Sequence, residues 1–294
     1  MSKMYEALRK AQLQGVSIDL PVPVVPNGTI GLESPLQPDH DPVVVDSRDY
    51  TPPQPENGGN SQMRQMPIQV SRETAVIPWD TSGPGSEQYR IIRTRIVQHP
   101  NRPKIIMISS PGSGDGKTVS AVNIAGVLSL RDNANVLLID GDFRRAGVSS
   151  ALGLPPGPGL SDTLQRSCTL REAIIRVEQF PNLYVLPAGT SETRTAELLD
   201  TEQWRSLCST VKEQFSFVMI DAPPIAAVAD YELIQASCDG VIIVVRPDHT
   251  DRTLVSKAFE LIPERKRLGV VLNCAYEWFL WKTHESYYYA SRGE

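Results

Sequence analysis

The sequence predicts an α/β fold, a doubly wound and mostly parallel sheet flanked by helices and preceded by a disordered N-terminal arm. From residue 86 onward, apolar runs rich in Val, Ile and Leu alternate with helical stretches. Such continuous runs are typical of parallel strands that helices bury on both faces. Half of the 24 prolines lie instead in the first 84 residues, and that composition is typical of a linker and not of a packed core.

Six candidate strands follow one another along the ordered part of the chain. They are expected at residues 104–109, 135–140, 183–187, 217–221, 240–245 and 268–273. Helices are expected between them at residues 118–130, 170–178, 202–214, 231–237 and 254–261. Because parallel sheets bind ligands beyond the carboxyl ends of their strands, polar motifs at those ends are the candidates for function.

The chain divides into four segments on this pattern. Residues 1–15 predict a short amphipathic helix, because apolar side chains recur there at helical spacing. Residues 16–84 are expected to be a Pro-rich disordered linker, residues 85–276 the α/β domain, and residues 277–294 a C-terminal tail. No window reaches about 18 consecutive apolar residues, so the chain is not expected to cross a membrane by itself.

The charge and the cysteines exclude two classes of protein. A net charge of −5 and a pI of about 5.5 argue against a protein that coats nucleic acid, because that affinity comes from clustered Lys and Arg. The four cysteines are tens of residues apart, without a CxxC pair. They predict reduced, buried thiols and neither a zinc site nor a disulfide framework.

A glycine-rich loop links the strand at 104–109 to the helix at 118–130. Its sequence at residues 111–118 is PGSGDGKT, and its glycines let backbone N–H groups approach phosphate oxygens. Lys117 is placed to reach the outer phosphates and the Thr118 hydroxyl to ligate Mg²⁺. A turn that only caps the helix is the alternative. The predicted nucleotide-binding residues of this loop are Gly112, Ser113, Gly114, Asp115, Gly116, Lys117 and Thr118.

Charged residues gather at the ends of two other strands. Asp140, Asp142 and Arg144 lie at the end of the strand at 135–140, and Asp221 ends the strand at 217–221. Charges in such places are costly unless they meet a metal, a phosphate or each other. A single Asp there is often only a helix N-cap. Three aspartates beside a phosphate-binding loop instead favour a cluster of carboxylates that takes part in function.

These motifs resemble those of the bacterial tyrosine kinases of exopolysaccharide and capsule synthesis, relatives of the cell-division and plasmid-partition ATPases. That family carries a Walker A loop, a second Walker motif ending in DxDxR, and a Walker B motif ending in DxxP. Residues 112–118, 140–144 and 221–224 match these motifs in order. The resemblance covers about residues 85–290. The chain departs from the usual patterns at Pro111, which stands where the loop has glycine, and at Ala146, which stands where the family has proline.

Two further segments resemble the kinase branch of this family. Glu87, Arg90 and Arg93 match its ExxRxxR helix, which implies assembly into a ring; the alternative is an ordinary surface helix with charge pairs. The tail carries a short tyrosine cluster similar to the one those kinases phosphorylate on themselves, and the alternative is a frayed end or an edge strand. These tyrosines are Tyr287, Tyr288 and Tyr289.

The resemblance also implies roles for the residues at the strand ends. A tyrosine hydroxyl has a pKa of about 10 and needs a carboxylate to accept its proton, and Asp140 or Asp142 is the candidate. Asn273, at the end of the last strand, is expected to bond the adenine edge. Mg²⁺ is expected on Thr118, Asp142 and Asp221, and catalysis on Lys117, Asp140, Asp142, Arg144 and Asp221.

The function implied is an ATP- and Mg²⁺-dependent protein-tyrosine autokinase that regulates exopolysaccharide production and phosphorylates its own tail in trans. The leader at residues 1–12 resembles those of exosortase-linked kinases. The implied partners are a membrane chain-length protein that activates the kinase, further copies in a ring and a cognate tyrosine phosphatase, but no nucleic acid. The implied location is the cytoplasmic face of the plasma membrane. The alternatives are a partition-type switch ATPase and an ATP-binding regulatory subunit.

Overall fold

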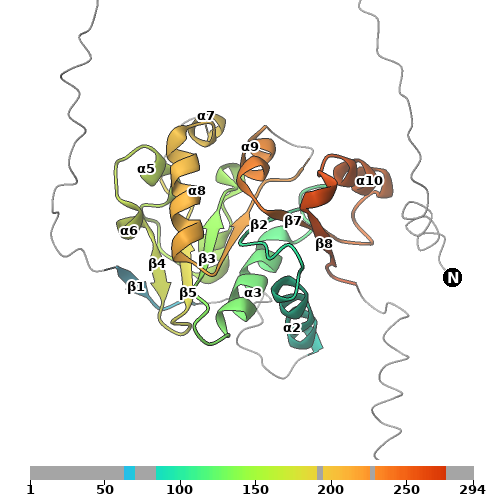
Figure 1. Cartoon of the computed structure of the whole chain (residues 1–294), viewed down its shortest axis with the longest axis horizontal. Coiled ribbons are helices and arrows are strands. Elements are labelled where there is room, and N and C mark those ends of the chain that lie inside the picture. Colours follow the sequence, from blue (N-terminus) through green and yellow to red (C-terminus); the bar gives the residue numbers. More distant parts are fainter. Residues whose placement is uncertain (1–62, 70–83, 191–194, 226–228, 276–294) are drawn as a thin grey trace, which may run out of the picture. The chain divides into compact units, whose positions relative to one another are not determined.

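The computed structural model describes residues 63–69, 84–190, 195–225 and 229–275. These residues form an eight-stranded sheet with helices on both faces (Figure 1). The strands lie in the order β1-β4-β5-β3-β6-β2-β7-β8. Their bounds are Arg64–Met66 for β1, Ile105–Ser109 for β2, Val136–Asp140 for β3, Ile175–Val177 for β4, Leu183–Leu186 for β5, Phe217–Asp221 for β6, Gly240–Val245 for β7 and Arg267–Leu272 for β8.

Six neighbouring strands run parallel to one another: β5, β3, β6, β2, β7 and β8. The β1–β4 pair is also parallel, and the β4–β5 pair of this sheet is antiparallel. The predicted doubly wound, mostly parallel sheet is thus confirmed. The helices are α2 (Pro84–Val97), α3 (Lys117–Ser129), α4 (Val148–Leu152), α5 (Leu160–Leu164), α6 (Leu170–Ala173), α7 (Thr195–Leu199), α8 (Glu202–Gln214), α9 (Asp230–Ser237) and α10 (Arg252–Glu260). Short 3₁₀ turns are η2 (Phe143–Arg145) and η3 (Glu264–Lys266).

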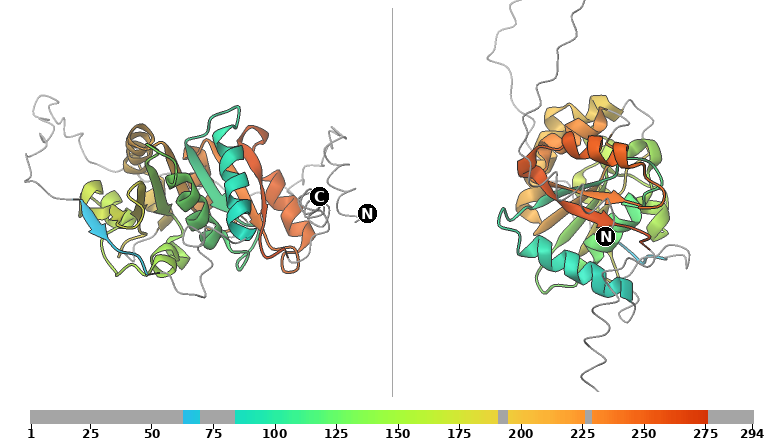
Figure 2. Two further views of the ribbon diagram at one scale, coloured as in Figure 1. Left: turned by 90° about the horizontal axis from the view of Figure 1, so that it is seen from below. Right: turned by 90° about the vertical axis from the view of Figure 1, so that its right-hand side faces the viewer.

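Alternate residues of the central strands feed two separate cores, one on each face of the sheet. On β2, Ile105 and Met107 belong to the core that also contains residues of α8 and α9, whereas Ile106 and Ile108 belong to the core that contains residues of α2 and α3. This alternation follows from the two-residue period of a strand. Figure 2 shows α2 and α10 on opposite faces of the sheet. Helix α3 is buried along most of its length, which explains why its sequence is apolar nearly all round.

The expected helix at 170–178 is wrong beyond its first turn. Helix α6 ends at Ala173, and Ile175–Val177 form strand β4. Thr169 and Glu172 start the helix with a capping box. The β-branched residues that follow favour a strand, and pairing with β5 and β1 satisfies their backbone.

A second correction concerns the segment 16–84, which the sequence predicts to be a linker throughout. Arg64–Met66 form β1, which pairs with β4 at one edge of the sheet. Ile68 is buried, and its backbone N–H and C=O bond the Gln179 side-chain amide at 3.1 and 3.2 Å. A three-residue strand carries too little pattern to stand out from a polar, Pro-rich background. The predicted helix at 1–15 and the tail at 277–294 lie outside the described residues.

No helix among the described residues is both long and apolar enough to cross a membrane. The four cysteines are all free thiols, as expected from their spacing. Cys208 and Cys238 are buried, and burial raises the pKa of the Cys208 thiol to about 12. Cys168 is half-buried and Cys274 exposed, so the expectation of four buried thiols holds only in part.

Replacing Gln179 by Ala should loosen the 63–69 segment without unfolding the domain. The change removes both side-chain bonds to Ile68, each worth about 1 kcal/mol. Amide hydrogen exchange in residues 64–68 should therefore quicken by roughly tenfold or more, with exchange in β2 and β3 unchanged. Gln65→Ala, an exposed change on β1 itself, is the control. Equal protection of the segment in the Gln179 variant would show that other contacts hold it.

Candidate nucleotide site

Three strands end together at the carboxyl edge of the sheet. Asp140 of β3 lies opposite Asp221 of β6, which in turn lies opposite Ile108 of β2. The loop that follows β2 therefore begins beside both aspartates. Parallel strands direct their carboxyl ends to one edge, so Asp140 and Asp221 become neighbours there although they are far apart in the chain.

The loop between β2 and α3 has the backbone of a phosphate cradle. Gly114 and Gly116 adopt φ angles of 90° and 87°, a region that side-chain-bearing residues rarely enter. A Cβ on Gly116 would lie 2.0 Å from the Asn273 amide nitrogen, so the neighbouring side chain also excludes one. Gly116 directly precedes α3, whose free N–H groups and positive dipole end face the loop.

Lys117 is ion-paired with two buried carboxylates. Its Nζ lies 2.7 Å from Asp142 Oδ2 and 3.6 Å from Asp221 Oδ1. The neighbouring Thr118 hydroxyl donates to Asp221 Oδ2 at 2.6 Å. Two residues of the predicted Walker A loop and two of the predicted carboxylates thus form one contiguous cluster.

Asp140 has a different environment from the other two carboxylates. It is fully buried, and its oxygens accept backbone N–H bonds from Asp142, Gly147 and Val148 at 3.3, 3.1 and 3.0 Å. Asp142 instead caps η2 by accepting from Arg145 N at 3.1 Å, and its other oxygen faces Lys117. Asp140 is thereby committed to shaping the turn that presents Asp142.

Burial sets the proton affinities of this cluster. It raises the pKa of Asp140 to about 7, with the Asp221 charge adding to the effect, and the pKa of Asp221 to about 6. Burial by itself lowers the pKa of Lys117, but the Asp221 and Asp142 carboxylates outweigh it and leave that pKa above its ordinary value. The lysine is therefore charged at neutral pH.

The residues present fit a Mg²⁺ ion of the kind that shares its ligands with a phosphate. Thr118, Asp142 and Asp221 offer hydroxyl and carboxylate oxygens, the ligands that hard cations prefer. The described residues hold no group of three or more His, Cys, Asp or Glu arranged around a metal. Mg²⁺ commonly takes one or two carboxylates and completes its shell with water and phosphate oxygens.

Some residues of the site carry no sequence motif that points to them. Asp230, nearly fully buried at the start of α9, pairs with Arg144 Nε at 3.2 Å. Thr250 and His249, in the loop after β7, contact the glycine loop at Asp115 and Ser113. Their one sequence signal is their position after a predicted strand, at the edge where ligands bind. Asn273 reaches the same loop from the end of β8.

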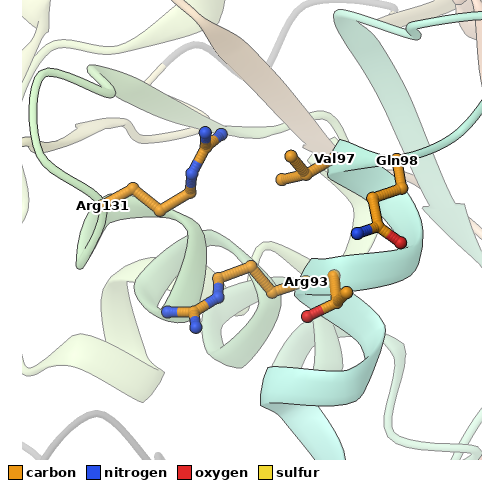
Figure 3. A pocket seen from close by; sticks show the side chains of 5 residues that line it. Arg93, Val97, Gln98 and Arg131 are labelled. Carbon is orange, nitrogen blue, oxygen red and sulfur yellow. The ribbon is translucent and has the colours of Figure 1, made fainter.

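The remaining predicted residues lie away from this cluster. Arg93 lies on α2 and lines a shallow hollow with Thr94, Val97, Gln98 and Arg131. Figure 3 shows the guanidinium groups of Arg93 and Arg131 extending into the space between α2 and the turn after α3.

On the same helix, Glu87 and Arg90 pair with each other at 3.1 Å. This exposed pair contributes only tenths of a kcal/mol, about 0.2–1 at most. The three predicted tyrosines lie outside the described residues.

The fold and the cluster define a P-loop nucleotide-binding domain. Residues 103–266 match the family described as AAA domain. Tyrosine-protein kinase YwqD of Bacillus subtilis (strain 168) is 33% identical over 192 residues, which cover 64% of this chain and 80% of that protein. Tyrosine-protein kinase CpsD of Streptococcus agalactiae is 32% identical over 193 residues, which cover 64% and 82%.

A solved structure agrees with these relatives. The chimerical protein CapA2B2 matches with a TM-score of 0.64 and 30% identity, over 72% of this chain and 92% of that one. The chain belongs to the bacterial tyrosine kinase branch of the AAA domain family.

The affinity of the domain for Mg²⁺-nucleotide should fall as the solution is acidified. The charge of a bound metal ion favours the ionised form of the nearby carboxylates. Asp140 and Asp221 have raised pKa values of about 7 and about 6, so they take up protons as the pH falls through that range. Binding should therefore release protons and weaken roughly tenfold between pH 8 and pH 6. Calorimetry in two buffers of different ionisation enthalpy measures both effects. Binding of nucleotide without Mg²⁺ is the control, and a pH-independent affinity without proton release would contradict the assignment.

Proposed function

We propose that this protein is an ATP-dependent protein-tyrosine kinase that phosphorylates the tyrosines of its own tail in trans and regulates exopolysaccharide production. The observation that carries the proposal is the buried cluster in which Lys117 bridges Asp142 and Asp221 beside the glycine loop. A P-loop lysine, a hydroxyl and two carboxylates are what phosphoryl transfer needs for positioning and charge stabilisation. The names of the relatives, tyrosine-protein kinases, support the same reaction.

Each residue of the cluster would have a separate role in the proposed phosphoryl transfer. Lys117 would turn from the carboxylates toward the outer phosphates of ATP, and the loop N–H groups would hold those phosphates. Thr118 and Asp221 would hold Mg²⁺, which would supply positive charge to the phosphate oxygens and so ease attack on the terminal phosphorus. Arg144 is anchored by Asp230 beside the same turn and adds a positive charge there.

Asp142 suits the role of proton acceptor better than Asp140. The oxygens of Asp140 are occupied by three backbone N–H groups. Asp142 Oδ2 faces only the Lys117 ammonium among the described contacts, and that ammonium leaves when it turns toward phosphate. A free carboxylate oxygen can orient the incoming tyrosine hydroxyl and accept its proton as the phenol oxygen attacks.

The proposal includes partners and a place in the cell. A membrane chain-length protein would supply the activating segment and hold the kinase at the cytoplasmic face of the plasma membrane. Further copies would form a ring through α2, in which the tail of one subunit enters the site of the next. Each phosphate adds close to two negative charges. Repulsion would then loosen the ring, and a cognate tyrosine phosphatase would restore it.

Mapping phosphotyrosine by mass spectrometry tests the reaction. Wild-type protein from its own cells should carry phosphate on Tyr287, Tyr288 or Tyr289, and Lys117→Met should lose it by 100-fold or more, because the bridging ammonium is gone. Lys257→Met, an exposed change on α10, should keep it. The same comparison with purified protein and ATP excludes phosphorylation by other kinases of the cell. Retained ATP hydrolysis without phosphotyrosine would instead indicate a switch ATPase.

Assembly is tested separately on α2. Arg93→Ala should shift the mass measured by light scattering from an oligomer to a monomer and lower phosphorylation in trans, because the hollow loses one of its two guanidinium groups. Arg95→Ala, an exposed change on the same helix, is the matched control and should leave the mass unchanged. An unchanged mass in the Arg93 variant would remove α2 from the proposed ring contact.

A further inference from the structure

The glycine loop is held from a second side, away from the carboxylates, by residues that follow β7 and β8. We propose that Thr250 and Asn273 are positioning residues that hold this loop in its phosphate-binding conformation through hydrogen bonds to Asp115. The inference rests on the proposed nucleotide site, and it applies whether the bound nucleotide feeds a kinase or a switch. Neither Thr250 nor His249 belongs to a motif that the sequence analysis singled out.

Asp115 is the centre of these contacts. Its side chain is buried, with only 1% of the residue exposed. Oδ2 accepts the Gly112 backbone N–H at 3.2 Å, and Oδ1 accepts a short bond from the Thr250 hydroxyl. Thr250 Oγ1 in turn accepts from Arg246 N at 3.2 Å. A buried carboxylate oxygen that loses its donor is left without a hydrogen bond, which strongly disfavours that arrangement. The side chain of Asp115 therefore serves the loop itself and does not face a ligand.

Asn273, which directly follows β8, forms a hydrogen bond with the same residue. Its Nδ2 donates to the Asp115 carbonyl oxygen at 2.9 Å, while its own backbone N–H bonds Val245 O at 2.9 Å. The side chain also occupies the space where a Cβ on Gly116 would lie. The amide nitrogen that was expected to read adenine is thus used on the loop in this structure.

His249 adds a third contact, with Nε2 3.2 Å from Ser113 O. Together the three side chains touch the loop at Ser113 and Asp115, between the glycines that give it its freedom. Glycines visit many backbone conformations, and only a few of these direct the N–H groups at one phosphate. Contacts that select this conformation before the ligand arrives reduce the entropy lost on binding.

The test uses the full chain and a fluorescent ADP, N-methylanthraniloyl-ADP, with Mg²⁺. Thr250→Val keeps the shape of the side chain but removes the hydroxyl, and should raise the dissociation constant of the nucleotide about tenfold. Thr250→Ser restores the hydroxyl and should return the constant to within about threefold of wild type. Thr210→Val is the matched control, because that hydroxyl donates to Ser206 O within α8, away from the loop.

Thermal unfolding without nucleotide separates positioning from stability. A merely structural role predicts a lower Tm with an unchanged dissociation constant for the folded protein, and that result would overturn the inference. Asn273→Ala provides a second variant if Thr250→Val does not fold, with the same expected loss of affinity. A constant within twofold of wild type in either folded variant also overturns it. If the wild type itself binds no nucleotide, the proposed function fails first, and the inference fails with its premise.

Discussion

The ion cluster of Lys117, Asp142 and Asp221 is the constraint on which the arrangement of the site depends. Each carboxylate is almost completely removed from water, and a buried charge without a partner costs several kcal/mol, about 3–5 when one partner is deleted. The ammonium is the counter-charge among the described residues. Its position at the first residue of α3 therefore ties the start of that helix to the ends of β3 and β6.

The register of the sheet makes this cluster possible. Asp140 and Asp221 face each other across β3 and β6, and β2 lies on the other side of β6. A slip of one residue in either pairing would turn the carboxylates to the opposite face of the sheet. The alternating apolar residues of the central strands, each committed to one of the two cores, oppose such a slip. The packing of the cores thus determines the geometry of the charges.

The sequence predicts those parts of the molecule that depend on local pattern. The six apolar strands, the glycine loop and the aspartates at strand ends are all short-range features, and the structure brings the loop and the aspartates together as expected. Strand β1 and strand β4 escape prediction because three residues carry little periodicity, and pairing partners decide their conformation. Thr250 and Asp115 are 135 positions apart, and no local pattern links residues at that distance.

The two supports of the glycine loop have different electrostatic characters. On the side of Thr250 and Asn273, the groups that bond the loop are a hydroxyl and a side-chain amide, neither of which carries a net charge. On the other side, the single charge of Lys117 serves both carboxylates. When that charge turns to a phosphate, Asp142 and Asp221 are left facing each other without a cation, an arrangement that their burial disfavours. On the proposed function, we therefore expect nucleotide and a divalent cation together to stabilise the site far better than nucleotide alone.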